Sequence, residues 1–458
     1  MLLASALTAS ADELRFPSGF LWGTATAAHQ VEGGNDKNDW WDWEQTPGHI
    51  KNGDKSGLAV DHWNRYESDL DLARALNCNS YRFSIEWSRV ENEDGTFNAD
   101  AIAHYRAMLL AMKKRGIVPM VTLWHFTTPR WAVAKGGWLS EEVIQRFVRF
   151  SGRMAHDLGD LVDLWCTQNE PTVAMLAGYA DKQFPPGVAS LPTALRVYAN
   201  LIRAHGLAYH AIHENDTVDA DGDGKPALVG IAAHLRVFDP LRPSHPGDIL
   251  AAKALDEVFN KVYFQACMKG EAKISLAGIV LATIKASYLR GTMDFIGLNY
   301  YSRDQVKFNP KSPMLADRVI PAGTPVSELN WEIYPEGIYR LLTEYKKYGK
   351  PIYITENGIA DSKDAQRPQF IRDHLYWVGR AIAEGADVRG YYHWSLMDNF
   401  EWAEGYWPRF GLYTVDYADN LKRTLTEGGR VFSGIAGANA VSTHGRALVT
   451  LPESLLSR

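Results

Sequence analysis

Two glutamates directly follow short apolar runs, in places where a buried strand would not be expected to become polar. Glu170 lies in the stretch TQNEP after the run at 164–166, and Glu356 lies in ITENG after the run at 351–354. A strand buried on both faces ends in such a cluster when its side chains face a polar site. Glycoside cleavage needs a pair of carboxyl groups. One protonates the leaving oxygen, and the other attacks the anomeric carbon or activates water.

Hydrogen-bonding and aromatic side chains recur at the ends of other apolar runs and could surround the two carboxylates. The candidates are His29, Gln30, Glu32, Arg82, Glu86, Trp87, Trp124, His125, Asn169, Asn299, Tyr300, Tyr301, His393, Trp394, Glu401 and Trp402. The fifth run offers only His234 and is the poorest in such groups. If the runs are the strands of one barrel, their ends converge on one mouth, and Glu170 faces a pocket.

The elements that must position these residues are eight short apolar runs separated by helical stretches. The runs are 20–27, 80–87, 117–124, 161–168, 227–234, 294–301, 351–358 and 388–395. This alternation predicts an α/β fold, a single (β/α)8 TIM barrel with enlarged βα loops at the C-terminal face. A doubly wound sheet is the alternative, but its edge strands would be less uniformly apolar.

Amphipathic segments between the runs predict helices, and a glycine follows the last turn of several of them. The predicted helices include 64–77, 101–116, 141–159 and 369–385. No Pro/Ser-rich linker divides the chain. We therefore expect one catalytic domain over 15–440, an unordered leader or leader remnant at 1–14, and a C-terminal tail at 441–458.

The distance between the two carboxyl groups would decide the stereochemistry of the reaction. Retaining enzymes hold them about 5–5.5 Å apart and inverting enzymes about 6.5–9.5 Å apart. Strands four and seven lie nearly opposite in an eight-stranded barrel, so Glu170 and Glu356 could approach each other across its mouth. The residues alone do not choose between the two distances. A structural ion pair is the alternative for either glutamate, and it is less favoured when both stand at strand ends.

Composition excludes several other classes of function. The chain of 458 residues has a net charge of −6, and no run of Lys or Arg follows any segment, which argues against a nucleic-acid partner. No apolar segment approaches the ~20 residues that span a membrane. Three scattered cysteines, Cys78, Cys166 and Cys267, suit a reducing compartment and favour a cytoplasmic location. The start MLLASALTASADE resembles a weak export signal and leaves export open.

The aromatic content is the unusual feature of the composition. Aromatic residues make up 12% of the chain, with 15 Trp and 21 Tyr, and many stand beside polar residues at the ends of apolar runs. Flat rings next to hydrogen-bonding groups suit a ligand with CH faces and many hydroxyls, which means a sugar. A Trp-rich core is the alternative explanation, and several of the tryptophans are expected to be core residues.

Seven motifs in matching order resemble glycoside hydrolase family 1, the β-glucosidase family. They are TQNEP, ITENG, FLWGTATAAHQVEGG, YRFSIEWSR, GLNYYS, NWEIYPEG and HWSLMDNFEWAEGYWPRFGL, and the match runs from about residue 15 to 440. The resemblance implies a retaining β-glycosidase that removes terminal β-linked sugars by double displacement through a covalent glycosyl-enzyme. Glu356 would be the nucleophile, and Glu170 would be the general acid and then the base.

The resemblance also assigns roles to the surrounding residues. Arg82 and Tyr301 match the groups that hold the nucleophile, and a neighbouring guanidinium favours an ionised carboxylate. Asn299 matches a supporting polar residue, and Trp331 matches a wall of the pocket entrance. The positions that match contacts with the sugar in the first subsite are Gln30, His125, Asn169, Trp394, Glu401 and Trp402.

The chain departs from the family pattern on the side of the leaving group. Many members carry Trp after the proline of the acid motif, where this chain has Thr172, and His125 is followed by Phe126 instead of Trp. We expect Thr172 to line a wider aglycone subsite that stacks a second glucose poorly. The stretches HFTTPRW and QFPPG resemble the archaeal-type branch, which often accepts galactosides and fucosides as well as glucosides.

Three other readings of the same fold compete with this one. Phospho-β-glycosidases generally carry a small polar residue in place of Glu401, and a carboxylate there would repel a phosphate. Plant-type thioglucosidases replace the acid glutamate with Gln, whereas this chain keeps Glu170. A non-catalytic sugar-binding protein would lack at least one catalytic carboxylate, and both are present.

We expect neither a cofactor nor a metal. DADGDGK at 219–225 resembles the start of a calcium loop, but its twelfth position is Gly230 instead of Glu, which favours a solvated acidic turn. His205, His210 and His213 share a predicted helix without the i, i+4 spacing of a zinc site. The expected partners are small sugars such as glucose and cellobiose. The sequence leaves open whether the protein is a monomer or a homo-oligomer.

Overall fold

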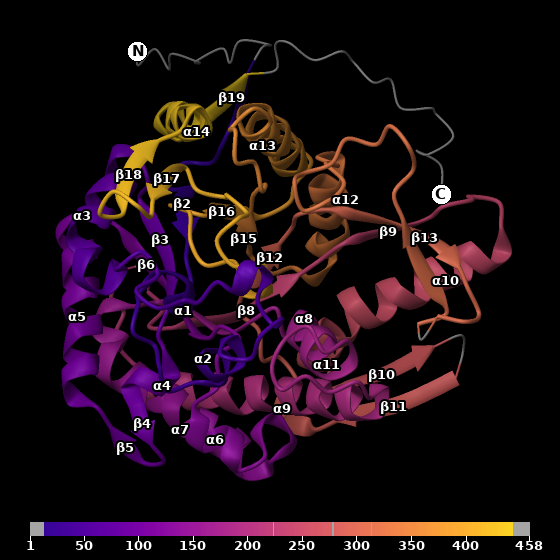
Figure 1. Cartoon of the computed structure of the whole chain (residues 1–458), viewed down its shortest axis with the longest axis horizontal. Coiled ribbons are helices and arrows are strands. Elements are labelled where there is room, and N and C mark those ends of the chain that lie inside the picture. The colour runs from indigo at the N-terminus through magenta and orange to yellow at the C-terminus, as the bar shows by residue number, and fades with distance from the viewer. Residues whose placement is uncertain (1–12, 223, 277–278, 313, 443–458) are drawn as a thin grey trace, which may run out of the picture.

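The computed structural model of the chain describes residues 13–222, 224–276, 279–312 and 314–442 (Figure 1). Its centre is a closed barrel of parallel strands in the order β12-β15-β16-β2-β3-β6-β7-β8. In chain order these strands are β2 (Leu21–Ala25), β3 (Ser80–Ser84), β6 (Val118–Trp124), β7 (Leu164–Asn169), β8 (Leu228–His234), β12 (Ile296–Asn299), β15 (Ile352–Asn357) and β16 (Val388–Trp394). Each of the eight predicted runs contains one of these strands or most of it, so the predicted TIM barrel is confirmed.

The strands form because the barrel buries both of their faces. Every residue of β7 and β15 is buried, as expected for parallel strands that have a filled interior on one side and helices on the other. Closure also requires close backbone approach at some positions. A Cβ on Gly358 would lie 2.0 Å from the carbonyl oxygen of Trp394, so glycine is the residue that fits after Glu356 and Asn357.

The helices surround the barrel, and the four helices predicted above are confirmed to within a few residues. The α-helices of the described residues are α1 (Ala28–Val31), α2 (Asp39–Glu44), α3 (His62–Ala75), α4 (Trp87–Val90), α5 (Ala99–Lys114), α6 (Arg130–Ala134), α7 (Glu141–Leu158), α8 (Pro171–Met175), α9 (Leu191–Asn215), α10 (Pro246–Asp256), α11 (Val262–Lys269), α12 (Glu336–Tyr345), α13 (Arg367–Ala383) and α14 (Glu427–Ala438). The four predicted helices correspond to α3, α5, α7 and α13. The sequence of α7 explains both where this helix begins and which of its sides is buried. Glu141 and Glu142 occupy its first turn, where negative charge is favourable, and Val143, Phe147 and Phe150 face the core.

Short strands in the connections were not predicted from the sequence. They are β4 (Glu91–Glu93), β5 (Thr96–Phe97), β9 (Val237–Pro240), β10 (Glu271–Leu276), β11 (Ile279–Lys285), β13 (Arg303–Phe308), β14 (Ala316–Val319), β17 (Tyr413–Asp416) and β18 (Lys422–Leu425). Strands β14, β13 and β9 form a small sheet, and β10 and β11 form a hairpin that lies beside α11. The loops that follow β8 and β12 therefore carry structure of their own.

The two ends of the domain are paired with each other. Strand β1 (Glu13–Arg15) runs antiparallel to β19 (Ala440–Ser442). The expected boundaries at 15 and 440 therefore cut through a paired element, and the domain extends at least from 13 to 442. Residues 1–12 and 443–458, which hold the rest of the expected leader and tail, lie outside the described residues.

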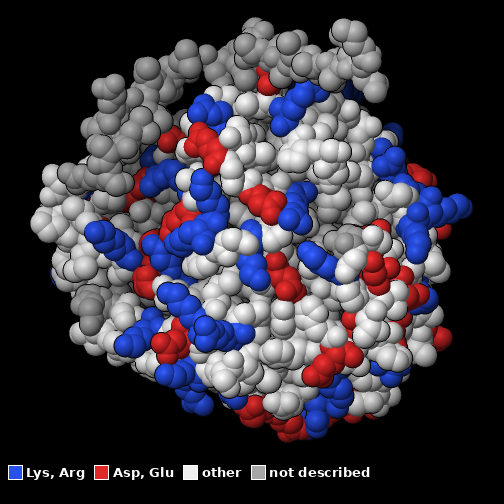
Figure 2. All heavy atoms as spheres, turned by 180° about the vertical axis from the view of Figure 1, so that it is seen from behind, with Lys and Arg blue, Asp and Glu red and all other residues white. Residues whose placement is uncertain are grey.

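The surface agrees with a chain that carries no strong single-sign field. Figure 2 shows basic and acidic side chains interspersed over the face seen from behind. Within the described part of the chain, no helix is both long and apolar enough to span a membrane.

Candidate active site

The polar ends of six barrel strands, β6, β7, β8, β12, β15 and β16, converge on one cleft of about 430 Å³. The other residues predicted at strand ends do not line this cleft, namely His29, Gln30, Glu32, Arg82, Glu86, Trp87, Trp124, Asn299, Tyr300 and His393. Among the residues expected at the site, those that line the cleft are His125, Asn169, Glu170, Tyr301, Trp331, Glu356, Trp394, Glu401 and Trp402. A second cavity, of about 390 Å³, contains neither Glu170 nor Glu356.

Glu356 is held as a carboxylate by one donor on each oxygen. Arg82 Nη1 lies 2.6 Å from Oε1, and the Tyr301 hydroxyl donates to Oε2 at 2.7 Å. Arg82 itself is fully buried and also donates to Thr122 and Asn169. A proton on either oxygen of Glu356 would face one of these donors, so the geometry favours the ionised form.

Glu170 stands in a different environment. It follows β7 with a positive φ of 43°, an uncommon backbone conformation outside glycine that is often found at functional sites. Its Oε1 accepts a hydrogen bond from Asn299 Nδ2 at 2.9 Å and lies 3.2 Å from His234 Nδ1. The described residues provide no donor to Oε2. A proton on this oxygen therefore has no competing donor, which is what a general acid requires.

The two carboxyl groups titrate as a pair. Burial raises the pKa of Glu356 to about 7, and the negative charge of Glu170 adds to the rise, while Arg82 and Tyr301 oppose it. Burial also favours a higher pKa for Glu170. The charge and the hydrogen bond of His234 outweigh this effect and lower the pKa of Glu170 below its usual value. Taken alone, the raised pKa of Glu356 and the lowered pKa of Glu170 would place the shared proton on Glu356.

The hydrogen bonds place that proton on Glu170 instead. The lowered pKa of Glu170 depends on a positive charge on His234. Arg236 Nε donates to His234 Nε2 at 3.0 Å, so Nε2 carries no proton and the imidazole is neutral. Without that charge, burial and the neighbouring Glu356 carboxylate favour the protonated form of Glu170, while the hydrogen bond of Asn299 and the charge of Arg236 oppose it. The pair thus separates into one carboxylate and one acid.

Two buried side chains, His125 and Gln30, each have one atom available for a hydrogen bond to a polar ligand. His125 Nε2 accepts from Asn169 Nδ2 at 3.0 Å, and burial lowers the pKa of His125 well below its usual value, so Nδ1 carries the proton of a neutral ring. Gln30 donates to Asn399, to the carbonyl oxygen of Phe400 and to the carboxylate of Glu401. His125 Nδ1 and Gln30 Oε1 are buried and have no partner among the described residues.

Glu401 is the third carboxyl group of the cleft. Burial raises its pKa to about 8, and the charges of Glu356 and Glu170 add to the rise. The carboxyl group of Glu401 therefore carries a proton through much of the neutral range. It can then both donate and accept hydrogen bonds, which suits contact with two hydroxyl groups of one ligand.

Aromatic rings provide the apolar surface of the cleft. The rings of Trp394 and Trp402 each lie about 6 Å from that of His125 and are close to parallel with it. On the outer side, Trp331 packs edge-on against Tyr301 with ring centroids 5.4 Å apart. Rings at the base and at the entrance, with hydrogen-bonding groups between them, match a pyranose with CH faces and equatorial hydroxyls.

The structure corrects the expectation for Thr172. This residue is buried, and its hydroxyl donates to the hydroxyl of Tyr198 at 3.2 Å. It is not among the residues that line the cleft, whereas Val173, the next residue in α8, is. The residue after the proline points inward because α8 turns that side toward α9, so Val173 is the candidate for the aglycone subsite.

Asn299 and Gln30 act from behind the cleft surface. Both are fully buried and do not line the cleft itself. Asn299 donates to Asn169 and Glu170 and accepts from Thr355 Oγ1 at 2.6 Å. Asn299 therefore fits the expected role of a supporting residue, since it links the ends of three strands.

Sequence reasoning missed several residues of the cleft. They are Phe126, Val173, Ala177, Gln183, Phe184, Arg236, Arg318, Leu329, Ala403 and Glu404. Most lie on loops, where no periodicity marks which side chain faces inward. His234, the last residue of β8, was named as the polar end of its strand, but no sequence signal linked it to Glu170.

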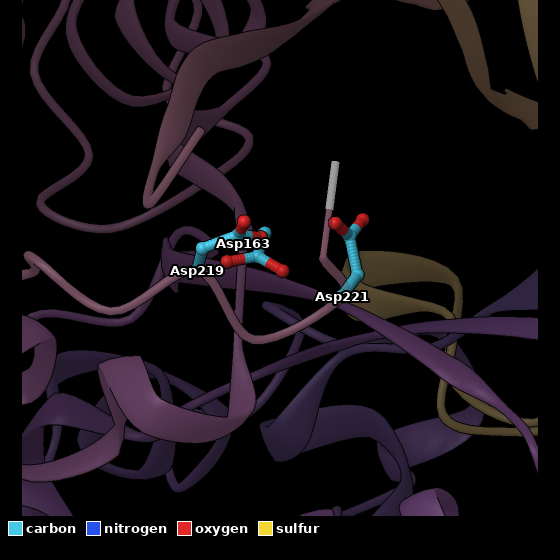
Figure 3. Close-up of side chains that lie close together, drawn as sticks. All are labelled: Asp163, Asp219 and Asp221. Carbon is cyan, nitrogen blue, oxygen red and sulfur yellow. The ribbon is translucent and has the colours of Figure 1, made fainter. Parts of the chain in front are cut away.

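The acidic turn at 219–225 gains a member that the sequence did not suggest. Asp163, which precedes β7, lies close to Asp219 and Asp221 (Figure 3). Asp219 accepts from the backbone N–H groups of Gly222 and Gly224, and Asp163 accepts from that of Ala220. These hydrogen bonds give the carboxylates a role in shaping the turn.

Curated relatives cover nearly the whole chain. A β-galactosidase from Pyrococcus woesei is 34% identical over 93% of this chain and 98% of its own. Beta-glucosidase A from Thermotoga maritima is 35% identical over 93% and 99%. A bifunctional β-D-glucosidase/β-D-fucosidase from Bifidobacterium breve is 34% identical over 88% and 94%.

Solved structures agree with these relatives. A β-glycosidase from Pyrococcus horikoshii superposes with a TM-score of 0.86 at 37% identity, covering 96% of this chain and 100% of the other. A β-glucosidase from Thermotoga maritima in complex with glucoimidazole gives 0.86 at 33% identity, covering 93% and 99%. The model of glycosyl hydrolase family 1 matches residues 12–441. The chain therefore belongs to glycosyl hydrolase family 1.

Proposed function

We propose that this chain is a retaining β-glycosidase in which Glu356 is the nucleophile and Glu170 is the acid and then the base. The observation that carries the assignment is the difference between the two carboxyl groups. Both oxygens of Glu356 accept hydrogen bonds from Arg82 and Tyr301, while the Oε2 of Glu170 has no donor among the described residues. The first group is suited to attack, and the second is suited to give and take a proton.

In the first step, a Glu356 oxygen attacks the anomeric carbon of a β-glycoside. The bond from that carbon to the leaving oxygen breaks, and Glu170 transfers its proton to this oxygen. A covalent glycosyl-enzyme and a free alcohol result. In the second step, Glu170 takes a proton from water, and the water oxygen displaces Glu356 from the anomeric carbon. The sugar leaves with its original β configuration, and Glu170 is protonated again.

We further propose that the sugar is a terminal glucose, galactose or fucose. His125 and Glu401 supply a donor and a carboxyl group to the cleft, and the buried Oε1 of Gln30 offers an acceptor directly behind Glu401. The relatives described above include enzymes named for β-glucosides, β-galactosides and β-fucosides. Cellobiose, short oligosaccharides and aryl or alkyl glycosides are the corresponding substrates.

A phosphorylated sugar is the competing substrate class. Because the pKa of Glu401 is raised to about 8, this group repels a phosphate less than a fixed carboxylate would. The Glu356 carboxylate retains its charge, however. The two guanidinium groups on the outer side, Arg236 and Arg318, are both paired with Asp304. These pairings favour an unphosphorylated sugar.

The three cysteines of the chain are free and buried in the structure. Their arrangement is compatible with the reducing, cytoplasmic location that we propose.

The stereochemistry of the first product tests the proposed function. Proton NMR during the first minutes of hydrolysis of an aryl β-glucoside should show β-glucose before mutarotation produces the α-anomer. Early accumulation of α-glucose would mean that water attacks directly and that Glu356 is not the nucleophile. The same spectra recorded with an aryl 6-phospho-β-glucoside should show no reaction.

A further inference from the structure

We infer that His234, oriented by Arg236, is a positioning residue for Glu170 that fixes which of its oxygens carries the transferable proton. This inference rests on the proposed role of Glu170 as acid and base. His234 is the last residue of β8, it is buried, and its Nδ1 lies 3.2 Å from Glu170 Oε1.

Arg236 sets the tautomer of His234. Its Nε donates to His234 Nε2 at 3.0 Å, so the ring proton must be on Nδ1, which faces Glu170. The imidazole therefore donates a hydrogen bond to Oε1 as a neutral ring. Asn299 donates to the same oxygen at 2.9 Å. With two donors on Oε1, the proton of Glu170 belongs on Oε2.

Arg236 is itself held firmly from both sides. Its guanidinium pairs with Asp304 at 3.0 Å, and its backbone N–H and C=O both bond to the side chain of Asn260. Asn260 is almost fully buried. The chain Asp304–Arg236–His234 thus runs from the small sheet of β13 and β9 to the acid/base group, and each link is a hydrogen bond or an ion pair.

Other titratable and charged groups also face this region. They are Tyr301 after β12, Glu356 on β15, Arg318 on β14 and Glu401 after β16. Of these, Arg318 is the useful comparison. It lines the same cleft and pairs with Asp304 at 2.8 Å, but neither its hydrogen bonds nor its ion pairs join it to His234.

Two substitutions of His234 separate the hydrogen bond from packing. His234→Leu keeps a side chain of similar size but removes the donor. His234→Asn places an amide N–H close to the position of Nδ1 and retains the donor. Thermal melting of both variants shows whether they fold.

The readout is the pH profile of kcat/KM on an alkyl β-glucoside and a dinitrophenyl β-glucoside. Loss of the donor destabilises the carboxylate form of Glu170, so in His234→Leu the alkaline limb for the alkyl substrate should move to higher pH. The plateau for that substrate should fall by about tenfold, since the acid is no longer oriented. The dinitrophenyl substrate, which needs little protonation, should change much less.

The control variants and the overturning outcomes are as follows. His234→Asn should stay close to the wild type, and Arg318→Met should leave the alkaline limb in place. An unmoved alkaline limb in His234→Leu, or an equal loss on both substrates, would overturn the inference. Glu170→Ala serves as the separate check on the proposed function. It should slow the alkyl substrate far more than the dinitrophenyl one, and equal losses there would overturn the role of Glu170 and the inference with it.

Discussion

Two identical side chains acquire different chemistry from the atoms around them. Glu356 and Glu170 are both buried glutamates at strand ends, yet one receives a donor on each oxygen and the other has both its donors on a single oxygen. Charge-assisted hydrogen bonds of this kind are about twice as strong as neutral ones. The proposed difference between nucleophile and acid is thus set at the scale of single hydrogen bonds.

The pH dependence of the reaction follows from the titration of the Glu356 and Glu170 carboxyl groups. The active form holds one proton on the two carboxyl groups, and the last proton of the pair is lost near pH 7, because burial and mutual repulsion raise the pKa of Glu356 to about 7. We predict that kcat/KM for an alkyl β-glucoside falls as pH rises through this range, since the acid is then deprotonated.

The control for this prediction is Glu170→Gln assayed on a dinitrophenyl β-glucoside. Its glycosylation step needs no acid, so the alkaline limb should be absent while the acid limb remains. An alkaline limb that survives in this variant would assign it to another group.

The leaving-group side provides a second prediction at the residue scale. Thr172→Val removes the buried hydrogen bond to Tyr198 and should lower the free energy of unfolding by about 1 kcal/mol without changing the Michaelis constant for cellobiose. Val173→Phe adds a ring inside the cleft and should change that constant for cellobiose more than for an alkyl glucoside. A change in the Michaelis constant for cellobiose in the Thr172 variant alone would contradict the assignment of Val173 to the aglycone subsite.

At the scale of elements, the sequence predicted the buried strands of the barrel but not the short strands in its loops. The strand β7 is apolar up to Cys166 because both its faces are covered, and its polar end marks the cleft. The short strands of the loops have no such signal. Most of them pair with a strand that is close in the chain, whereas β9 pairs with the distant β13, and each of them has only a few residues. Thr172 was misplaced for a related reason, since a sequence does not state which way the single turn of α8 faces.

The hairpin of β10 and β11 allows a test of whether the structured loops pack against the domain. Ile274 on β10 is fully buried, whereas Val280 on β11 is 52% exposed. We predict that Ile274→Ala lowers the free energy of unfolding by about 2–5 kcal/mol, because it leaves a cavity in packed surroundings. Val280→Ala on the same hairpin should change it by no more than about 0.5 kcal/mol. Equal effects in denaturant melts would show that the hairpin does not pack against the domain.

At the scale of the whole molecule, the barrel and the meeting of Glu170 and Glu356 in one cleft could be predicted from the residues, because most strand ends repeat one pattern. The contacts between distant segments could not. The side chain of Asn439 accepts a hydrogen bond from Trp22 Nε1 at 2.9 Å and donates to the carbonyl oxygen of Phe16, and β1 pairs with β19 nearby. His234 belongs to the same class, since its link to Glu170 joins two strands by a side-chain contact that leaves no mark in either segment.

The central claim is that Glu356 attacks the sugar, and trapping of the intermediate tests it most directly. A dinitrophenyl 2-deoxy-2-fluoro-β-glucoside forms the glycosyl-enzyme readily but releases it slowly, so the covalent species accumulates. Mass spectrometry of the intact protein and of its proteolytic peptides should find one sugar attached, on the peptide that contains Glu356. A label on Glu170, or turnover with no covalent species at all, would contradict the account.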